Sequence, residues 1–361
     1  MSLHLNPPFR ADHIGSLKRP AKLLQMRKAL DDKSCTQEEL TAVEDEAITA
    51  VIQVQREAGI KSITDGEFRR RSKLERTKPF YVPQYEALKK LTKPEEHKNL
   101  KITMCAPEWF HLRHGEYAYP KDVYKTDEEY FADIALAYQQ EIKELYDAGC
   151  RMYASDVDHN GSNVGAVGNI QFDDPLLAYF CAESMIKGME ETGIDHEAIL
   201  DLYIKAYNDC LKDHPADMTV GLHLCRGNFK DGVHFSEGGY DRIAIKLFRN
   251  INVDCYYLEY DTERAGTFEP LKFLPKNKSL VLGLISSKLP QLEDVSELKT
   301  KVLQAAEVIA NGEEKRSVAE ALNHPQCGFA SHSEGNKVTE EDVKNKLSLV
   351  SRAAKEIWSE A

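Results

Sequence analysis

The amino-acid sequence predicts an α/β protein built as a single (β/α)8 barrel (TIM barrel). Short apolar segments alternate with longer amphipathic ones along the chain. Its 361 residues are long enough for eight strand–helix units with insertions. A doubly wound open sheet is the alternative, but no glycine-rich phosphate loop follows any of the predicted strands.

The strand–helix unit is clearest where a capping box, a helix, a glycine and a strand follow one another. Residues 36–39 have the Thr-x-x-Glu pattern that begins a helix, and apolar residues then recur at helical spacing. Gly59 is a typical helix stop, and residues 61–65 form the next predicted strand. A second copy consists of the capping box 126–129, Gly149 and the predicted strand 151–156.

The same criteria give all eight strands and the helices between them. The predicted strands are 11–16, 61–65, 101–106, 151–156, 219–225, 255–260, 280–287 and a weak one before Cys327. Predicted helices include 175–191, 196–212, 295–311 and 340–358. Residues 75–125 contain charge clusters, prolines and many tyrosines, and we expect loop insertions over the barrel mouth there. Residues 1–361 are thus predicted to form one domain.

Composition excludes several classes of function. The net charge of −12 argues against a general nucleic-acid binder, which normally has a basic face. No apolar run approaches the ~20 residues of a membrane helix. Residues 1–13 lack the basic start and apolar stretch of a secretion signal. The eight cysteines are irregularly spaced, so we expect reduced thiols in a cytoplasmic protein.

A candidate metal site comes from residues at three predicted strand ends. His223 and Cys225 are two apart on a strand and therefore share a face, and imidazole with thiolate is a zinc-preferring pair. Alone this pair is a weak signal, because a buried cysteine is usually a small apolar filler. Cys327 is flanked by glycine, and Glu259 is an acid inside an apolar strand. A metal would offset the burial of Glu259, although a salt bridge with Arg264 is the alternative.

Three further polar residues lie at predicted strand ends, where the catalytic groups of a barrel gather. They are Ser16, Glu67 and Asp156. Two acids and a hydroxyl around a zinc would suit a substrate with an ammonium and a carboxylate. Ser16 can equally be a turn residue, and Glu67 an acid favoured by a helix dipole.

In combination and in order, these motifs resemble those of the cobalamin-independent methionine synthase family. The resemblance is to the C-terminal catalytic half of the full-length enzymes, and more closely to short stand-alone relatives of that half. It runs from Ile-Gly-Ser16 to Cys327-Gly and includes Asp65-Gly-Glu67, His223-x-Cys225 and Leu258-Glu-Tyr-Asp261. The family implies a (β/α)8 barrel that holds Zn²⁺ through His223, Cys225, Glu259 and Cys327. It also implies amino-acid contacts from Ser16, Glu67 and Asp156.

The resemblance implies a zinc-dependent methyltransferase that converts homocysteine to methionine. Its small-molecule partners would be the homocysteine thiol and a methyl donor. Zinc would keep the thiol deprotonated, so the sulfur itself is the nucleophile. Three alternatives stay open. The first is a zinc-dependent alkyltransferase for another thiol or donor, such as an epoxide-opening thiol transferase. The others are a metal-free decarboxylase on a related barrel, and a barrel that has lost catalysis and serves regulation or storage, which the four intact ligand positions disfavour. The His-x-Cys pattern disfavours the decarboxylase.

The sequence differs from the full-length enzymes in the parts that bind the methyl donor and protonate its leaving group. We expect no counterpart of their N-terminal half, which helps to hold the folate. Where they have a histidine that protonates the leaving folate nitrogen, this chain has Lys288. Lys288 is therefore a candidate catalytic residue, but an amine with an ordinary pKa near ~10.4 is a weak proton donor. We expect a smaller folate or an activated donor such as a sulfonium.

Overall fold

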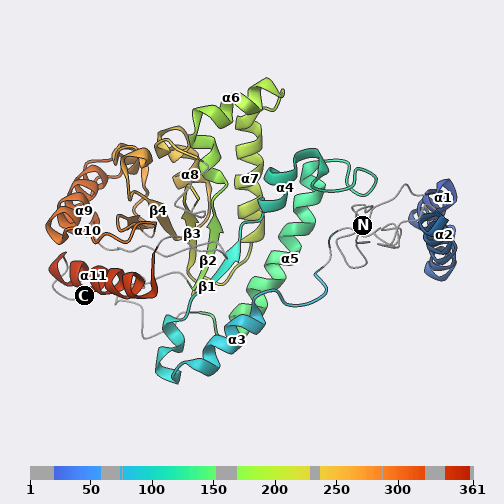
Figure 1. Ribbon diagram of the computed structural model, residues 1–361, viewed down its shortest axis with the longest axis horizontal. Coiled ribbons are helices and arrows are strands. Elements are labelled where there is room, and N and C mark those ends of the chain that lie inside the picture. Colours follow the sequence, from blue (N-terminus) through green and yellow to red (C-terminus); the bar gives the residue numbers. More distant parts are fainter. Residues whose placement is uncertain are drawn as a thin grey trace, which may run out of the picture. The chain divides into compact units, whose positions relative to one another are not determined.

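The computed structural model describes residues 20–57, 74, 76–151, 169–227, 236–286, 288–321 and 338–357 (Figure 1). The chain divides into two compact units, Met1–Lys73 and Leu74–Ala361. None of the helices within these described ranges is long and apolar enough to cross a membrane.

The first unit contains a pair of helices, α1 (Ala21–Asp31) and α2 (Gln37–Glu57). They share a small apolar core that includes Leu23 and Leu40. The predicted capping box is confirmed. The Thr36 backbone N–H donates to Glu39 Oε2 at 2.7 Å, and the Glu39 N–H donates to Thr36 Oγ1 at 3.2 Å. This reciprocal pair satisfies two backbone donors at the start of α2.

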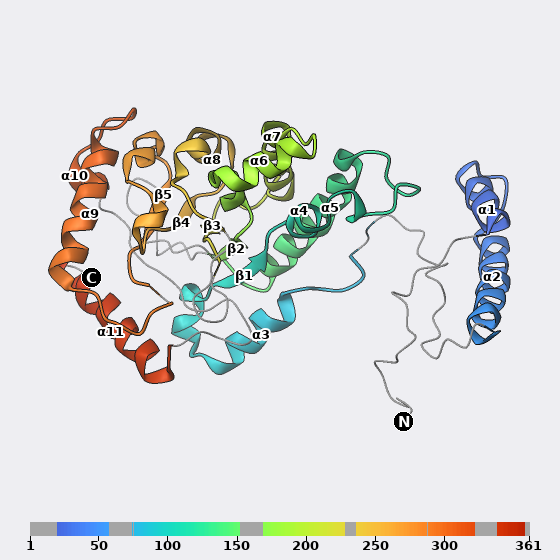
Figure 2. The same cartoon turned by 45° about the horizontal axis from the view of Figure 1, so that its top comes forward.

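The second unit is organised around a parallel sheet of five strands that lie side by side in sequence order (Figures 1 and 2). The strands are β1 (Ile102–Cys105), β2 (Ile170–Asp174), β3 (Val220–Leu224), β4 (Cys255–Glu259) and β5 (Ser279–Gly283). The helices are α3 (Val82–Leu91), α4 (Trp109–His114), α5 (Asp127–Asp147), α6 (Glu183–Glu191), α7 (His196–Cys210), α8 (Ala244–Asn250), α9 (Val295–Ala310), α10 (Val318–Ala321) and α11 (Glu340–Ile357). Parallel neighbours need crossover connections, and helices supply them here.

Most predicted elements in the described ranges are confirmed. Strands β1, β3, β4 and β5 lie where strands were expected, and α7, α9 and α11 match predicted helices to within two residues. The predicted helix 175–191 is interrupted. A short 3₁₀ helix (Leu177–Cys181) precedes α6, because Ala182 adopts an extended conformation. Strand β2 was not predicted, since its sequence Ile-Gln-Phe-Asp-Asp has little apolar character. The predicted strands 11–16, 61–65 and the one before Cys327, and all but the first residue of 151–156, lie outside the described residues.

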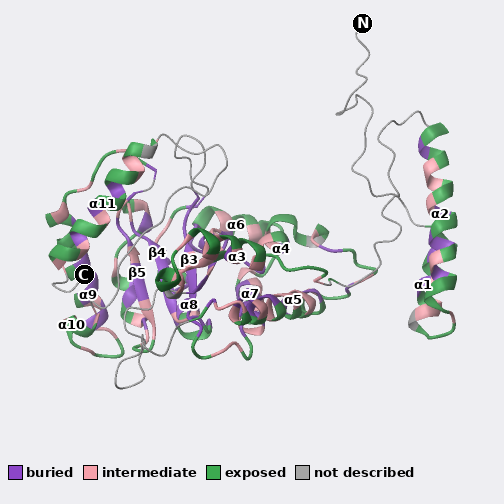
Figure 3. Cartoon of the chain, turned by 90° about the horizontal axis from the view of Figure 1, so that it is seen from below, coloured by how far each residue is buried: buried purple, intermediate pink, exposed green. Residues whose placement is uncertain are grey.

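The two faces of the sheet have different roles. One face is apolar and packs on helices: Phe172 of β2 contacts Tyr207 of α7 edge to face at 5.3 Å, and Tyr256 of β4 contacts Phe248 of α8 at 5.1 Å. Figure 3 shows that buried residues are concentrated in the strands and along the helices. The alternate residues of each strand point to the other face, and these include Asp173, His223 and Tyr257. The sheet therefore separates an apolar core from a polar face.

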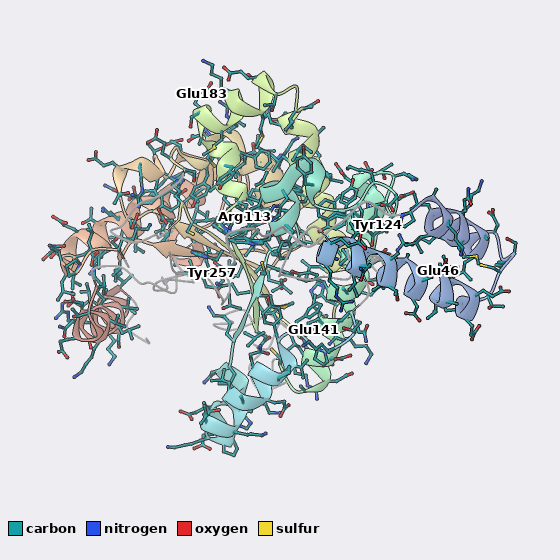
Figure 4. All side chains as sticks on the ribbon, turned by 45° about the vertical axis from the view of Figure 1, so that its right-hand side comes forward. Glu46, Arg113, Tyr124, Glu141, Glu183 and Tyr257 are labelled. Carbon is teal, nitrogen blue, oxygen red and sulfur yellow. The ribbon has the colours of Figure 1, made fainter. Side chains whose placement is uncertain are left out.

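Helix α3 is fixed at its start by a buried carboxylate, Glu141 of α5 (Figure 4). Glu141 Oε1 accepts hydrogen bonds from the backbone N–H groups of Tyr81 (2.7 Å) and Val82 (3.1 Å). Its Oε2 accepts from the Phe80 N–H (2.7 Å) and from Arg76 Nε (2.8 Å). Four donors thus satisfy a carboxylate that would otherwise be costly to bury.

Candidate functional site

The polar face of the sheet brings a histidine and a carboxylate together. Asp173 and His223 are direct neighbours in the register of β2 and β3, and His223 Nδ1 lies 2.5 Å from Asp173 Oδ1. A carboxylate at Nδ1 favours the tautomer with its proton on that nitrogen, which leaves Nε2 free as an acceptor or metal ligand. Asp173 was not predicted as a site residue. The sequence predicted Asp156, and not Asp173, as the strand-end acid of this region, because β2 was not recognised as a strand.

Asp174, the last residue of β2, follows Asp173 and points to the apolar face of the sheet. Its Oδ1 accepts from the backbone N–H groups of Leu176 and Leu177, and its Oδ2 accepts from the Tyr207 hydroxyl at 2.7 Å. Glu108 is buried beside it. Burial, together with the charge of Asp174, raises the pKa of Glu108 well above its usual range. This network fixes the backbone from which Asp173 reaches His223.

Cys225 directly follows β3, two residues after His223, so the period of a strand puts both on one face. Its thiol is buried. Burial raises its pKa to about 12, with the charges of Asp173 and Glu259 acting in the same direction and that of Lys288 opposing them. The Cys225 thiol is therefore neutral at physiological pH unless a cation binds it.

Glu259 at the end of β4 is surrounded by cationic groups. Its Oε2 lies 2.6 Å from Lys288 Nζ, and its Oε1 lies 3.3 Å from Arg264 Nη2. The backbone N–H of Arg226 also donates to Oε2 at 3.3 Å. Lys288 Nζ reaches a second carboxylate, Asp261, at 3.4 Å. The salt bridge between Glu259 and Arg264, which the sequence offered as the alternative to a metal, is thus present. Lys288 is the nearer cation.

Tyr257 of β4 (labelled in Figure 4) is in register with His223, and its ring lies over Gly221, toward the N-terminal end of β3. Its ring covers Gly221, two residues before His223, so closely that a Cβ at Gly221 would lie 2.6 Å from Tyr257 Cε2. Lys101 Nζ lies 4.5 Å from the centre of the same ring. This packing requires glycine at position 221 and makes a floor beneath His223.

Part of the predicted site lies within the described residues. His223, Cys225, Glu259 and Lys288 lie at the ends of β3, β4 and β5, whereas Ser16, Glu67, Asp156 and Cys327 are outside the described residues. Among the side chains that the structure places, no group of three or more His, Cys, Asp or Glu is arranged to hold a metal ion. The donor chemistry nevertheless fits zinc. An imidazole bonded through its other nitrogen to a carboxylate, with a thiol on the same face, is a typical zinc-binding pair.

Similar proteins are known, although no protein-family model matches the chain. Two Bacillus subtilis proteins, YxjG and YxjH, are 34% and 32% identical and are both described as uncharacterized. They align over 98% and 97% of this chain, respectively, and over 95% of their own lengths. The methionine synthase of Saccharolobus solfataricus is 23% identical over 92% of this chain and 95% of its own length.

The structural comparison agrees. A crystal structure from Listeria monocytogenes, described as a candidate vitamin-B12-independent methionine synthase, is 28% identical and matches with a TM-score of 0.55. The match covers 97% of this chain and 98% of that one. Sequence and structure therefore agree over almost the full length of the relatives, and the chain belongs to the cobalamin-independent methionine synthase-like family.

Proposed function

We propose that this protein is a zinc-dependent methyltransferase that transfers a methyl group to homocysteine and forms methionine. The observation that supports this most is the Asp173–His223 pair beside the buried Cys225 thiol, in a chain of the methionine synthase-like family. We also propose that residues 1–361 form one (β/α)8 barrel, and that the loop insertions over its mouth come from residues 75–125 outside β1. The parallel order of β1–β5 supports this arrangement.

The proposed zinc ligands are His223, Cys225, Glu259 and Cys327. Nε2 of His223 would be the ligand nitrogen, because Nδ1 is bonded to Asp173. When bound, zinc would supply the positive charge that keeps both the Cys225 thiol and the substrate thiol deprotonated.

Residues of the chain would supply binding and orientation. We propose that Ser16, Glu67 and Asp156 bind the carboxylate and ammonium of the amino acid. Asp173 orients the His223 ring, and the Tyr257 ring, which covers Gly221, excludes water from the side of His223 toward the start of β3. Lys288 was a candidate proton donor, but its ammonium already donates to Glu259 and Asp261. These contacts support a role for Lys288 in holding Glu259.

The first prediction concerns the methyl donor. We expect zinc-loaded protein to form methionine slowly or not at all from methyltetrahydrofolate triglutamate, and faster from a sulfonium donor. The reason is that a sulfonium leaves without needing a proton, whereas a folate nitrogen needs one that Lys288 is poorly placed to give. The measurement is the rate of methionine formation with homocysteine and each donor, for the wild type and for Lys288→Ala.

Two outcomes would change this account. Rapid methionine formation from the triglutamate, undiminished in Lys288→Ala, would contradict the prediction of a sulfonium donor. It would mean that the chain uses the folate donor, as full-length methionine synthases do. If no donor methylated homocysteine, the proposed reaction itself would fail. Equal calorimetric affinity for homocysteine and for a thiol without an α-amino group would then favour an alkyltransferase for another thiol.

A further inference from the structure

A buried lysine on the C-terminal helix is linked to the candidate site through a chain of hydrogen bonds. Lys346 of α11 has no solvent exposure. Its Nζ donates to the Gln291 backbone carbonyl at 2.6 Å and lies 3.1 Å from each carboxylate oxygen of Glu293. All three acceptors belong to the segment that follows β5. Figure 2 shows α11 beside α9, which begins directly after this segment.

The same segment carries Lys288. Glu293 Oε1, which accepts from Lys346, also accepts from the backbone N–H of Ser286 at 2.9 Å. The Ser286 hydroxyl accepts from the Lys288 N–H at 3.3 Å and donates to Asp261 at 2.9 Å. Lys288 Nζ then reaches Glu259 at 2.6 Å. The contacts therefore run from Lys346 on α11 through Glu293, Ser286 and Lys288 to Asp261 and Glu259 at the end of β4.

Lys346 depends on these contacts because it is buried. An ammonium without solvent is costly unless its protons are bonded, and an apolar side chain of similar length would pack there without that cost. The three acceptors of Lys346 are what compensate its burial, so its charge fixes Gln291 and Glu293 in place. A residue that only joined α11 to its neighbours would not need a charge.

We propose that Lys346 and Glu293 are positioning residues that hold Ser286 and residues 288–293 in place, so that Lys288 keeps its ion pair with Glu259. The proposal rests on the proposed function only in treating Glu259 as part of the functional site. The contacts themselves do not depend on a bound metal or substrate.

The test is the chemical accessibility of Lys288 in metal-free protein. Brief acetylation of the native protein, quantified by mass spectrometry, reports the reactivity of each lysine. We expect Lys288 to react slowly in the wild type, and about tenfold faster in both Lys346→Met and Glu293→Ala because the segment then opens locally. The double variant should react no faster than the more reactive single variant, since both changes break the same chain of contacts.

Matched controls separate positioning from loss of structure. Lys278 is a partly buried lysine at the start of β5, and its reactivity should stay unchanged in every variant. Glu293→Gln keeps an acceptor for the Ser286 N–H, so it should protect Lys288 better than Glu293→Ala does. Should Lys346→Met fail to fold, the comparison of the two Glu293 variants decides the question.

The result that would overturn the proposal is an unchanged Lys288 reactivity in Glu293→Ala and Lys346→Met. If hydrogen exchange in α11 rose in that case, Lys346 would be a helix anchor and nothing more. Because the assay uses neither zinc nor thiol, its outcome is independent of the proposed methyl transfer. Protein that binds no zinc but shows the expected Lys288 reactivity would refute the proposed function and leave the positioning role standing.

Discussion

Replacing Cys225 with serine is expected to lower zinc affinity by at least about 100-fold, because even partners outside the coordination shell contribute 10–100-fold. A hydroxyl cannot supply the soft, negatively charged sulfur that a thiolate gives to zinc. Wild-type protein should bind about one zinc per chain, because the four proposed ligands make a single tetrahedral site. Cys327→Ser should behave like Cys225→Ser, whereas Glu259→Gln should weaken zinc less. Competition with a coloured chelator and elemental analysis of dialysed protein would measure the affinity and the content.

Cys255 provides the matched control for this change. It is buried, it lies on β4 next to β3, and burial raises its pKa to about 12, as for Cys225. It is in register with Gly221, however, at the end of the strand away from the candidate site. Cys255→Ser should therefore keep full zinc. The assignment would be wrong if Cys225→Ser and Cys327→Ser both retained zinc as tightly as Cys255→Ser.

The largest effect on stability is expected at Glu141. Glu141→Ala removes the acceptor of three backbone N–H groups at the start of α3 and leaves Arg76, whose side chain is 3% exposed, without its buried partner. Breaking a buried pair in this way costs on the order of 3–5 kcal/mol of unfolding free energy. Urea denaturation followed by circular dichroism would measure the change.

Glu144 is the control for Glu141, because it pairs with the same arginine from a more exposed position. Glu144→Ala should cost less than Glu141→Ala, on the order of 1–3 kcal/mol, because it leaves part of a buried guanidinium unpaired but removes no acceptor from the start of α3. Similar losses in the two variants would mean that Arg76, and not the capping of α3 by Glu141, carries the contribution.

The parts of the site that the sequence predicted depend on local periodicity. His223 and Cys225 could be placed on one face because a strand has a period of two, and β3 has an apolar run clear enough to be recognised. The helices α2 and α5 could be located because their capping threonines and the glycine after α5 are local signals. Gly149 indeed has a φ of +99°, the left-handed conformation expected of a helix stop.

The parts that were missed depend on contacts between distant segments. Asp173 is 50 residues from His223, and the two meet only because β2 and β3 pair in a particular register. Lys288 is 29 residues from Glu259, so the sequence indicated the local partner Arg264 instead. Lys346 is 53 residues from Glu293, its partner in the segment after β5. Such pairs leave no periodic trace in a single sequence.

X-ray absorption at the zinc edge, with and without homocysteine, would show whether these strand ends hold a thiol-activating zinc. We expect two sulfur ligands in the substrate-free protein, from Cys225 and Cys327, and one additional sulfur when homocysteine binds. The histidine nitrogen from His223 should remain bound in both states. A spectrum without sulfur ligands, or one that saturating homocysteine leaves unchanged, would contradict the claim that these strand ends hold a thiol-activating zinc.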